Sequence, residues 1–283
     1  MKHFNKLTIG FAAIAILSTS CSTNNTNNTS SQTVETCYAT VTDTETGETF
    51  LSQSVSTTFK LNWDTSKADF IINDLNLDGN TNTLTVTDID WGIEGTKWYT
   101  SKIATVSGSF TPALGAVTLT NFSYKWNNYA LVFNFTIDDR YVVTGSLDQF
   151  VFYGKYTVYT DGVDDYEGKA TNFVAQVNLK TRELSIGMYN ATFSANMPVS
   201  VNLQMSKIPF YFTNMGKTIV FEKEELIPST IGDDIPQPKR PISDLKGTIT
   251  PGAGMSLEFI CTVGNTPYKV IANPTLFSEN DEF

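Results

Sequence analysis

Polar and apolar residues alternate in short runs along most of the chain, from Cys37 to Phe277. Many of the apolar positions are β-branched or aromatic, and Gly, Asn or Asp interrupts the runs at short intervals. A period of two residues is typical of a strand with one buried face, and the interruptions are typical of turns. No stretch shows the period of an amphipathic helix over a useful length. The pattern therefore predicts an all-β protein.

Two parts of the chain repeat one pattern in the same order. The matched pairs are residues 131–137 with 257–263, residues 141–143 with 268–270 and, more weakly, residues 61–65 with 177–181. A tandem duplication is the simplest explanation of matches that keep their order. We therefore expect two antiparallel β domains, residues 37–152 and 153–277, followed by a short tail, residues 278–283.

Two architectures suit such domains. Each half has an ordinary size for an independently folding unit. A domain of short strands must protect the edges of its sheet, either by closing into a barrel or by packing two sheets into a β-sandwich. The periodicity of the sequence leaves both architectures open.

The first 20 residues are expected to be a signal peptide. A basic start, with Lys2 and Lys6, precedes an apolar run over residues 9–17 that is too short to cross a bilayer as a helix. The segment Leu17-Ser-Thr-Ser-Cys21 resembles the lipobox of bacterial lipoproteins, in its looser form common in Bacteroidetes. In such a motif the cysteine thiol is acylated, so we expect a lipid on Cys21. An ordinary secretory signal beside a chance cysteine is the alternative.

Residues 21–36 are expected to form a flexible tether behind the lipidated Cys21. The segment is rich in Ser, Thr and Asn and cannot bury enough apolar surface to offset the entropy lost on ordering. A lipid anchor makes a membrane the first predicted partner. We therefore predict a lipid-anchored protein of the cell envelope, at the outer membrane, on its periplasmic face or on the cell surface.

Spaced elements of the second half are similar to a known family. They are Met197-Pro198, Ile208-Pro209, Ile227-Pro228, residues 245–249 and residues 268–270. Together they resemble the calycin-like (lipocalin-like) domain of uncharacterised lipoproteins from gut Bacteroidetes, whereas the first half departs from this pattern. The resemblance implies a small antiparallel barrel and supplies no catalytic residues.

Composition and charge narrow the range of functions. The chain of 283 residues has a formal charge of -10 and a pI near 4.6, which argues against binding nucleic acid through its phosphates. Its single histidine, His3, leaves with the signal, and the loss of Lys2 and Lys6 takes the charge to -12. Histidine-based nucleophiles and histidine-ligated metal sites are therefore absent, and no phosphate-binding or dinucleotide motif occurs. We predict a protein that is not an enzyme and needs no cofactor.

Two cysteines remain after Cys21 is used for the lipid. Cys37 and Cys261 stand near opposite ends of the folded region and could close one disulfide in an oxidising envelope. The alternative is that Cys261 is a core residue of an apolar strand.

Residues 74–82 resemble the opening of an EF-hand calcium loop. The candidate oxygen ligands are Asp74, Asn76, Asp78 and Asn80. The bidentate Glu of such loops is missing, because Thr85 occupies the twelfth position. The flanking residues have the pattern of strands, so a hairpin with its tip at residues 78–80 is the favoured interpretation. An incomplete calcium site is the alternative, and no other metal site is expected.

Aromatic residues of the first domain are the candidate ligand site. They are Trp91, Trp98, Tyr99, Trp126 and Tyr129. Several stand beside turn residues, where rings can stack on sugars or line the cavity of a barrel, and packing in the core is the alternative. We predict a non-catalytic lipoprotein with two lipocalin-like domains that binds a small lipid-like or glycan ligand or a protein partner.

Two other functions stay open. A fimbrial or adhesion-type structural subunit is the first alternative, because such lipoproteins also pair a lipobox with two β domains. A carboxylate-pair hydrolase is the second, because some pair among 29 acidic residues can meet the required spacing by chance.

Overall fold

The computed structural model describes residues 30–77, 79–94, 98–111, 114–127, 129–162 and 165–277. Every regular element in these ranges is a β-strand. None of the described residues belongs to a helix that could cross a membrane. The predicted signal, the lipidation site Cys21 and the predicted tail lie outside the described residues.

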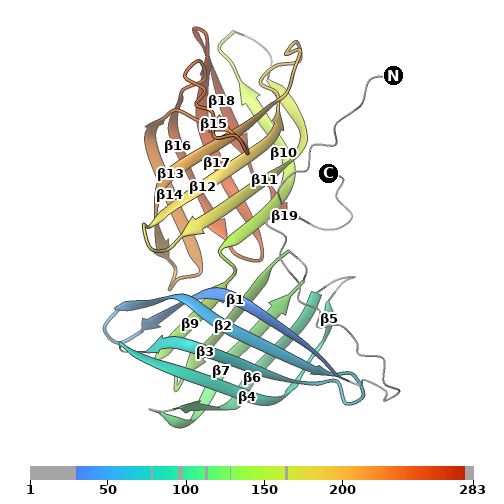
Figure 1. Ribbon diagram of the computed structural model, residues 1–283, viewed down its shortest axis with the longest axis vertical. Helices are drawn as coiled ribbons and strands as arrows, with labels where there is room; N and C mark the ends of the chain where they lie inside the picture. Colours follow the sequence, from blue (N-terminus) through green and yellow to red (C-terminus); the bar gives the residue numbers. More distant parts are fainter. Residues whose placement is uncertain are drawn as a thin grey trace.

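The first sheet closes on itself to form an eight-stranded barrel, which we call barrel 1 (Figure 1). Its strands are β1 (Ser30–Asp43), β2 (Thr49–Asn62), β3 (Lys67–Leu77), β4 (Asn80–Asp90), β6 (Trp98–Thr111), β7 (Gly115–Trp126), β8 (Leu131–Ile137) and β9 (Tyr141–Ser146). Strands that follow one another pair antiparallel, and β9 returns to pair with β1. The short strand β5 (Gly92–Glu94) pairs with β6 beside this circle.

The second sheet closes in the same way into barrel 2. Its strands are β10 (Gln149–Tyr159), β11 (Tyr166–Asn178), β12 (Glu183–Ala191), β13 (Val201–Thr213), β14 (Thr218–Leu226), β16 (Ile242–Thr250), β17 (Gly254–Val263) and β18 (Thr266–Ala272). The last strand, β18, pairs with the first, β10. Two short strands, β15 (Ser229–Thr230) and β19 (Thr275–Leu276), pair with this barrel outside the circle.

The predicted all-β fold of two tandem antiparallel domains is confirmed, and both domains are barrels instead of sandwiches. Closure gives every strand of the circle two paired neighbours and so removes the exposed sheet edges. Eight-stranded up-and-down barrels are the architecture of lipocalins.

The repeated segments occupy equivalent places in the two barrels. Residues 131–143 lie on β8 and β9 and residues 257–270 on β17 and β18, the last two strands of each circle. The weaker match falls on the turns β2–β3 and β11–β12. There Asn62 Oδ1 accepts hydrogen bonds from the backbone N–H groups of residues 64 and 65, at 3.0 and 3.1 Å. Asn178 Oδ1 accepts the corresponding bonds from residues 180 and 181, at 3.1 and 3.2 Å.

The domain boundaries differ from the predicted ones by a few residues. Residues 30–36, expected in the tether, form the start of β1 and pair with β2. Their Thr and Val side chains favour a strand, and the partner strand supplies the backbone hydrogen bonds that composition alone does not reveal. The boundary expected at residues 152 and 153 falls inside β10, whose Phe150 and Phe152 already belong to the core of barrel 2. Barrel 1 ends at Ser146 and barrel 2 begins at Gln149.

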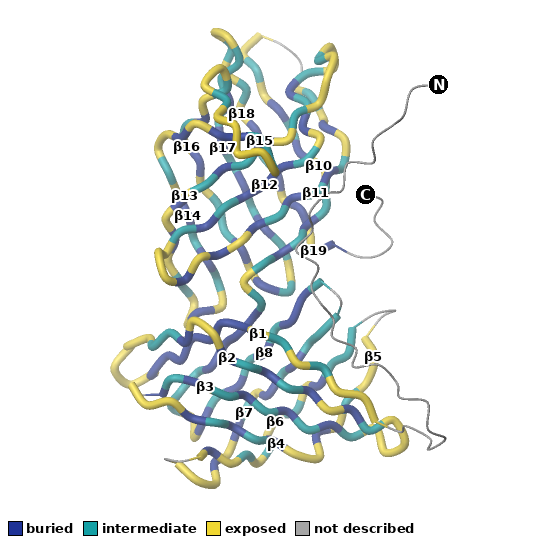
Figure 2. The backbone as a smooth tube through the Cα atoms, in the orientation of Figure 1, coloured by how far each residue is buried: buried dark blue, intermediate teal, exposed yellow. Residues whose placement is uncertain are grey.

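Aromatic rings fill the interior of barrel 1. Buried and less buried residues alternate along its strands, as expected when every second side chain points inward (Figure 2). The rings in mutual contact include Phe59, Phe70, Phe122, Tyr124, Phe133 and Phe135, all with at most 2% of their surface exposed. Centroids lie 4.3 Å apart for Phe59 and Tyr124 and 5.6 Å apart for Phe70 and Phe133. These rings occupy the space that an internal ligand would need.

One end of barrel 2 rests on the outer wall of barrel 1 (Figure 1). The turn between β13 and β14 meets β1, where a Cβ atom at Gly216 would lie 1.9 Å from Thr40 Oγ1. The turn between β16 and β17 meets β8, where a Cβ atom at Gly252 would lie 2.8 Å from Val132 Cγ2. Both glycines have positive φ, so no other residue suits both the turn and the close approach.

Tyr38 ties the two barrels together. Its neighbours Cys37 and Ala39 lie in the core of barrel 1, whereas Tyr38 points outward and joins the core of barrel 2. The ring is fully buried, with its centroid 5.6 Å from that of Phe212 on β13. Its hydroxyl has no hydrogen-bond partner among the described residues. Burial raises the pKa of this hydroxyl, with smaller contributions from Cys37 and Asp148.

Substitutions of Tyr38 test how strongly the junction stabilises the protein. Tyr38→Ala should lower the free energy of unfolding by about 3–5 kcal/mol, because it removes a fully buried ring. Tyr38→Phe keeps the ring and removes only an unpartnered hydroxyl, so it should leave stability unchanged or raise it by up to about 1 kcal/mol. Chemical denaturation followed by circular dichroism measures both. A Tyr38→Ala protein as stable as the parent would show that this ring does not hold the junction.

The disulfide considered for Cys37 and Cys261 is not formed. Both are free and buried, Cys37 in the core of barrel 1 and Cys261 in the core of barrel 2. Each points into its own barrel, so the wall of a barrel lies between them. Burial raises the pKa of both thiols to about 12, an effect that Thr57 partly offsets at Cys37.

Thiol chemistry checks this arrangement. A reductant should leave the melting temperature unchanged, because no disulfide constrains the fold. A maleimide reagent should leave Cys37 and Cys261 unmodified in the native protein and label both in denaturant, since buried thiols with a raised pKa react slowly. Peptide mass mapping distinguishes the two sites. A reductant-sensitive melting temperature would contradict the assignment of free thiols.

Candidate functional site: the aromatic mouth of barrel 1

Aromatic residues gather at one end of barrel 1, each beside the end of a strand. The group consists of Trp63 after β2, Trp91 after β4, Tyr99 near the start of β6 and Trp126 at the end of β7. We call this group, together with Glu35 of β1, the aromatic mouth. Because neighbouring strands run antiparallel, the end of one strand and the start of the next lie at the same end of the barrel.

The four rings form one contiguous cluster. The rings of Trp63 and Trp91 meet edge to face, with centroids 5.1 Å apart and planes at 85°. Tyr99 lies 6.2 Å from Trp63 and 6.0 Å from Trp91, and it stacks on Trp126 at 5.1 Å. Stacked and edge-to-face contacts are the favourable geometries for aromatic pairs. The cluster therefore holds its rings in fixed orientations, with Trp63 outermost at 44% exposure.

Glu35 brings a carboxyl group to the mouth. The side chain is half-buried and is hydrogen-bonded to Trp126, whose indole N–H can only donate. Burial raises the pKa of Glu35, and the hydrogen bond from Trp126 partly offsets this effect. The backbone carbonyl of Glu35 accepts a hydrogen bond from Thr57 Oγ1 at 3.2 Å. The mouth therefore combines apolar rings with one carboxyl group that Trp126 holds in place.

Trp91 adds an unused donor. Its Nε1 atom is buried and has no hydrogen-bond partner among the described residues. A buried donor without a partner costs about 1–3 kcal/mol. A ligand group that reaches this atom and accepts its hydrogen bond would recover that energy. The mouth therefore has one donor that lacks an acceptor.

Three of the five predicted aromatic residues meet at the mouth and two lie elsewhere. Trp98 precedes Tyr99 on β6 and lies beneath the ammonium group of Lys125, 5.6 Å from the ring centroid. Tyr129 packs against Phe277 at 4.9 Å, close to barrel 2. Adjacent residues of a strand point to opposite faces, which explains why Trp98 and Tyr99 separate.

Two members of the mouth, Trp63 and Glu35, are not among the predicted site residues. The matched repeat contained the signal, because it aligns Trp63 with Leu179 in the turns β2–β3 and β11–β12. Leu179 is only 6% exposed and belongs to the core cluster of barrel 2. A large exposed ring in place of a covered leucine, at the same turn, marks the end of barrel 1 as different.

The calcium candidates lie around the hairpin of β3 and β4. Leu77 pairs with Asn80, which confirms the predicted hairpin. Asp74 and Asn76 lie on β3, and Asp78 is outside the described residues. No group of three or more acidic, cysteine or histidine residues suited to a metal occurs in the part of the chain that the structure describes. The incomplete calcium site stays a prediction.

Two clefts flank the junction between the barrels. One, of about 530 Å³, is lined by polar groups that include Gln53, Asp148 and Gln176. The other, of about 510 Å³, lies between the β1–β2 hairpin and residues of barrel 2 that include Arg182 and Tyr211. Neither involves the residues of the aromatic mouth.

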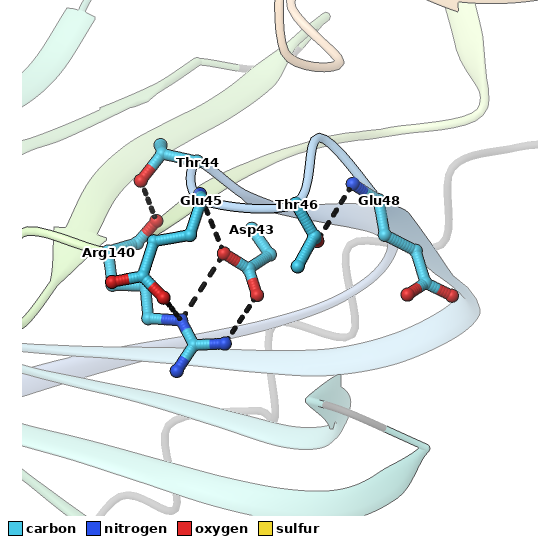
Figure 3. A network of polar contacts seen from close by, with 6 residues as sticks. All are labelled: Asp43, Thr44, Glu45, Thr46, Glu48 and Arg140. Carbon is cyan, nitrogen blue, oxygen red and sulfur yellow. Dashed lines mark hydrogen bonds and ion pairs between the residues drawn. The ribbon is translucent and has the colours of Figure 1, made fainter.

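An ion pair braces the hairpin that borders the second cleft (Figure 3). Arg140 donates from Nη2 to Asp43 Oδ2 at 2.6 Å and from Nε to Asp43 Oδ1 at 3.2 Å. The carbonyl of Arg140 accepts hydrogen bonds from the N–H and the hydroxyl of Thr44, at 3.0 and 2.8 Å. The hydrogen bond from Arg140 is the main cause that lowers the pKa of Asp43 to about 2.

The pH dependence of stability tests this pair. A carboxyl whose pKa is lower in the folded state than its ordinary 3.8 stabilises the fold above that value. Asp43→Asn should therefore destabilise the protein at neutral pH. The difference from the parent should shrink as the pH falls from about 4 towards 2 and the parent loses the ionised carboxylate. Denaturant midpoints measured across this range check it. A difference that does not vary with pH would contradict the role of the charge.

The fold and the mouth together define a class: a tandem of closed up-and-down β-barrels with an exposed aromatic site on the first barrel. Comparison with family models finds no match, and neither does comparison with curated proteins. Among solved structures the chain is similar to transferrin-binding protein B of Haemophilus parasuis, a double mutant, with 9% identity and a TM-score of 0.22 over 88% of this chain and 76% of that one. The corresponding protein of Neisseria meningitidis has 8% identity and a TM-score of 0.23, over 88% and 77% of the two chains. At these levels of similarity, the function has to be argued from the chain's own residues.

Proposed function

We propose that this protein is a non-catalytic binding module of the cell envelope, and that the aromatic mouth of barrel 1 is its binding site. The observation that carries the proposal is the cluster of Trp63, Trp91, Tyr99 and Trp126, in which Trp63 is exposed and the other three rings are partly buried. The cluster holds an unpartnered buried indole N–H beside a half-buried carboxyl. Apolar surface with a few fixed polar groups is typical of binding sites.

The packing of barrel 1 supports a site at the mouth instead of one inside the barrel. Lipocalin-like barrels can hold a ligand in the interior. Here the rings of Phe59, Phe70 and Tyr124 occupy the interior and contact one another. A bound molecule would therefore contact the outer rings of the cluster, with Trp63 first.

The placement of the acidic groups supports a non-catalytic role. Burial raises the pKa of two carboxyl groups, those of Glu35 and Asp148. Glu35 is bonded to Trp126 in the mouth, whereas Asp148 lines a cleft at the junction. Hydrolysis by an acid pair needs both carboxyl groups on one substrate. The cleft that Asp148 lines does not include Glu35.

The signal, the lipid on Cys21 and the envelope location belong to the same proposal. The lipobox-like segment that ends at Cys21 supports them, as does the resemblance of the second half to calycin-like lipoproteins of Bacteroidetes. The two eight-stranded barrels agree with that resemblance in architecture.

Tryptophan fluorescence tests the binding site. The four tryptophans are at positions 63, 91, 98 and 126, and three of them lie in the mouth, so the emission reports on it. The probes are neutral oligosaccharides, a C16 fatty acid and a β-hairpin peptide that displays a tyrosine. At least one class should produce a saturable shift, and Trp63→Ala should weaken that binding by about tenfold or more.

Trp98→Ala is the matched control, because Trp98 lies on the same end of β6 but outside the cluster. It should leave binding unchanged. The proposal fails if no class of probe binds, or if binding survives Trp63→Ala and is lost in Trp98→Ala.

A further inference from the structure

The end of barrel 1 that carries the mouth is the counterpart of the end of barrel 2 that rests on barrel 1. In barrel 1 this end consists of the turns β2–β3, β4–β6 and β7–β8. In barrel 2 it consists of the turns β11–β12, β13–β14 and β16–β17. The last two of these meet the wall of barrel 1 at Thr40 and Val132. This end of barrel 2 thus packs on a sheet of barrel 1, while the equivalent end of barrel 1 carries exposed apolar side chains.

Two exposed apolar side chains lie close together on the end of barrel 1. Trp63 is 44% exposed and Ile93, on β5, is 61% exposed. They are neighbours, because Ile93 pairs with Tyr99 and the ring of Tyr99 lies 6.2 Å from that of Trp63. Grouped exposed apolar side chains with an aromatic anchor are typical of protein interaction surfaces.

We propose that the mouth end of barrel 1 docks on the outer face of a β-sheet in another protein, in the way in which barrel 2 docks on barrel 1. The inference rests on the proposed function and names its partner. The partner's sheet presents an aromatic side chain, as barrel 1 presents Tyr38. That side chain packs on Trp63 and Ile93, and polar groups around it satisfy Trp91 Nε1 and Glu35.

The two equivalent walls of a second copy of this chain do not fit the mouth. The part of the wall of barrel 1 that carries Tyr38, Thr40 and Val132 is already covered by barrel 2. The repeat identifies the corresponding wall of barrel 2. The register of strand pairing shifts around Tyr38 in β1 and around Lys155 in β10, so Lys155 occupies the position equivalent to Tyr38. The match of residues 131–137 with 257–263 likewise places Glu258 at the position of Val132.

That second wall is charged. Lys155 pairs with Glu167 at 3.1 Å, and Glu258 pairs with Lys269 at 3.0 Å and with Lys246 at 3.5 Å. If an apolar mouth covered these charged groups, they would lose their hydrogen bonds to water and gain none from the mouth, which is unfavourable. The partner is therefore a different protein, whose sheet face is apolar at this point.

The difference between the walls of the two barrels can be tested with the full chain alone. Lys155→Tyr and Glu258→Val give the wall of barrel 2 two of the residues that barrel 1 uses at the junction, Tyr38 and Val132. If the mouth docks on such a wall, the double variant should associate head to tail, because a contact between two different surfaces propagates from copy to copy. Sedimentation velocity should show the parent as a monomer and the variant as oligomers whose size grows with protein concentration.

Further substitutions separate docking from general stickiness. Adding Trp63→Ala to the double variant should return it to a monomer, while adding Trp98→Ala should leave the oligomers intact. Lys155→Tyr alone, at a largely exposed position, serves as the test if the double variant does not fold. Circular dichroism shows whether each variant is folded.

Three results of the association experiments would overturn the inference. They are folded wall variants that stay monomeric, oligomers that persist after Trp63→Ala, and a parent chain that already self-associates through Trp63. Binding of a saccharide or fatty acid at Trp63 without binding of the tyrosine hairpin would also overturn it, while the proposed function would stand. If no probe binds at the mouth, both the inference and the proposed function fail.

Discussion

The closure of each sheet into a barrel is the constraint on which the other features depend. Pairing of β4 with β6 and of β10 with β11 completes the two circles and removes the free sheet edges. A closed barrel sorts side chains strictly into inward and outward sets. The inward set of barrel 1 is crowded with rings, so the interior is core and the cluster around Trp63 lies at the barrel's end. Closure thus leaves the interior of barrel 1 filled by its own side chains.

The junction between the two barrels is built on side chains that point outward from barrel 1. Tyr38 leaves the wall of barrel 1 and completes the core of barrel 2, while Gly216 and Gly252 let two turns approach that wall closely. An outward side chain that would face water in an isolated barrel therefore becomes a core residue of its neighbour. The two barrels share apolar contacts as well as a linker, which makes a fixed relative orientation the expectation.

The two repeats use the same end differently. Leu179 is buried in the core of barrel 2, whereas Trp63 in the equivalent turn is exposed and backed by Trp91, Tyr99 and Trp126. A duplicated barrel provides two equivalent ends, and one of them is used for assembly within the chain. The other retains an apolar surface, an unpartnered donor and a half-buried carboxyl. This asymmetry between equivalent positions is the physical basis of the proposal that barrel 1 carries the binding site.

The sequence by itself determined the strand content, the tandem repeat and three members of the mouth, because alternation and turn residues are local signals that survive without tertiary contacts. The choice of barrel over sandwich, the start of β1 at Ser30 and the free state of Cys37 and Cys261 needed the tertiary structure, since each depends on which distant strand lies alongside. Trp63 and Tyr38 show the same limit. Whether a ring in a turn or on a strand is exposed, or buried in a neighbouring barrel, depends on the packing of the two repeats, and no local pattern encodes that packing.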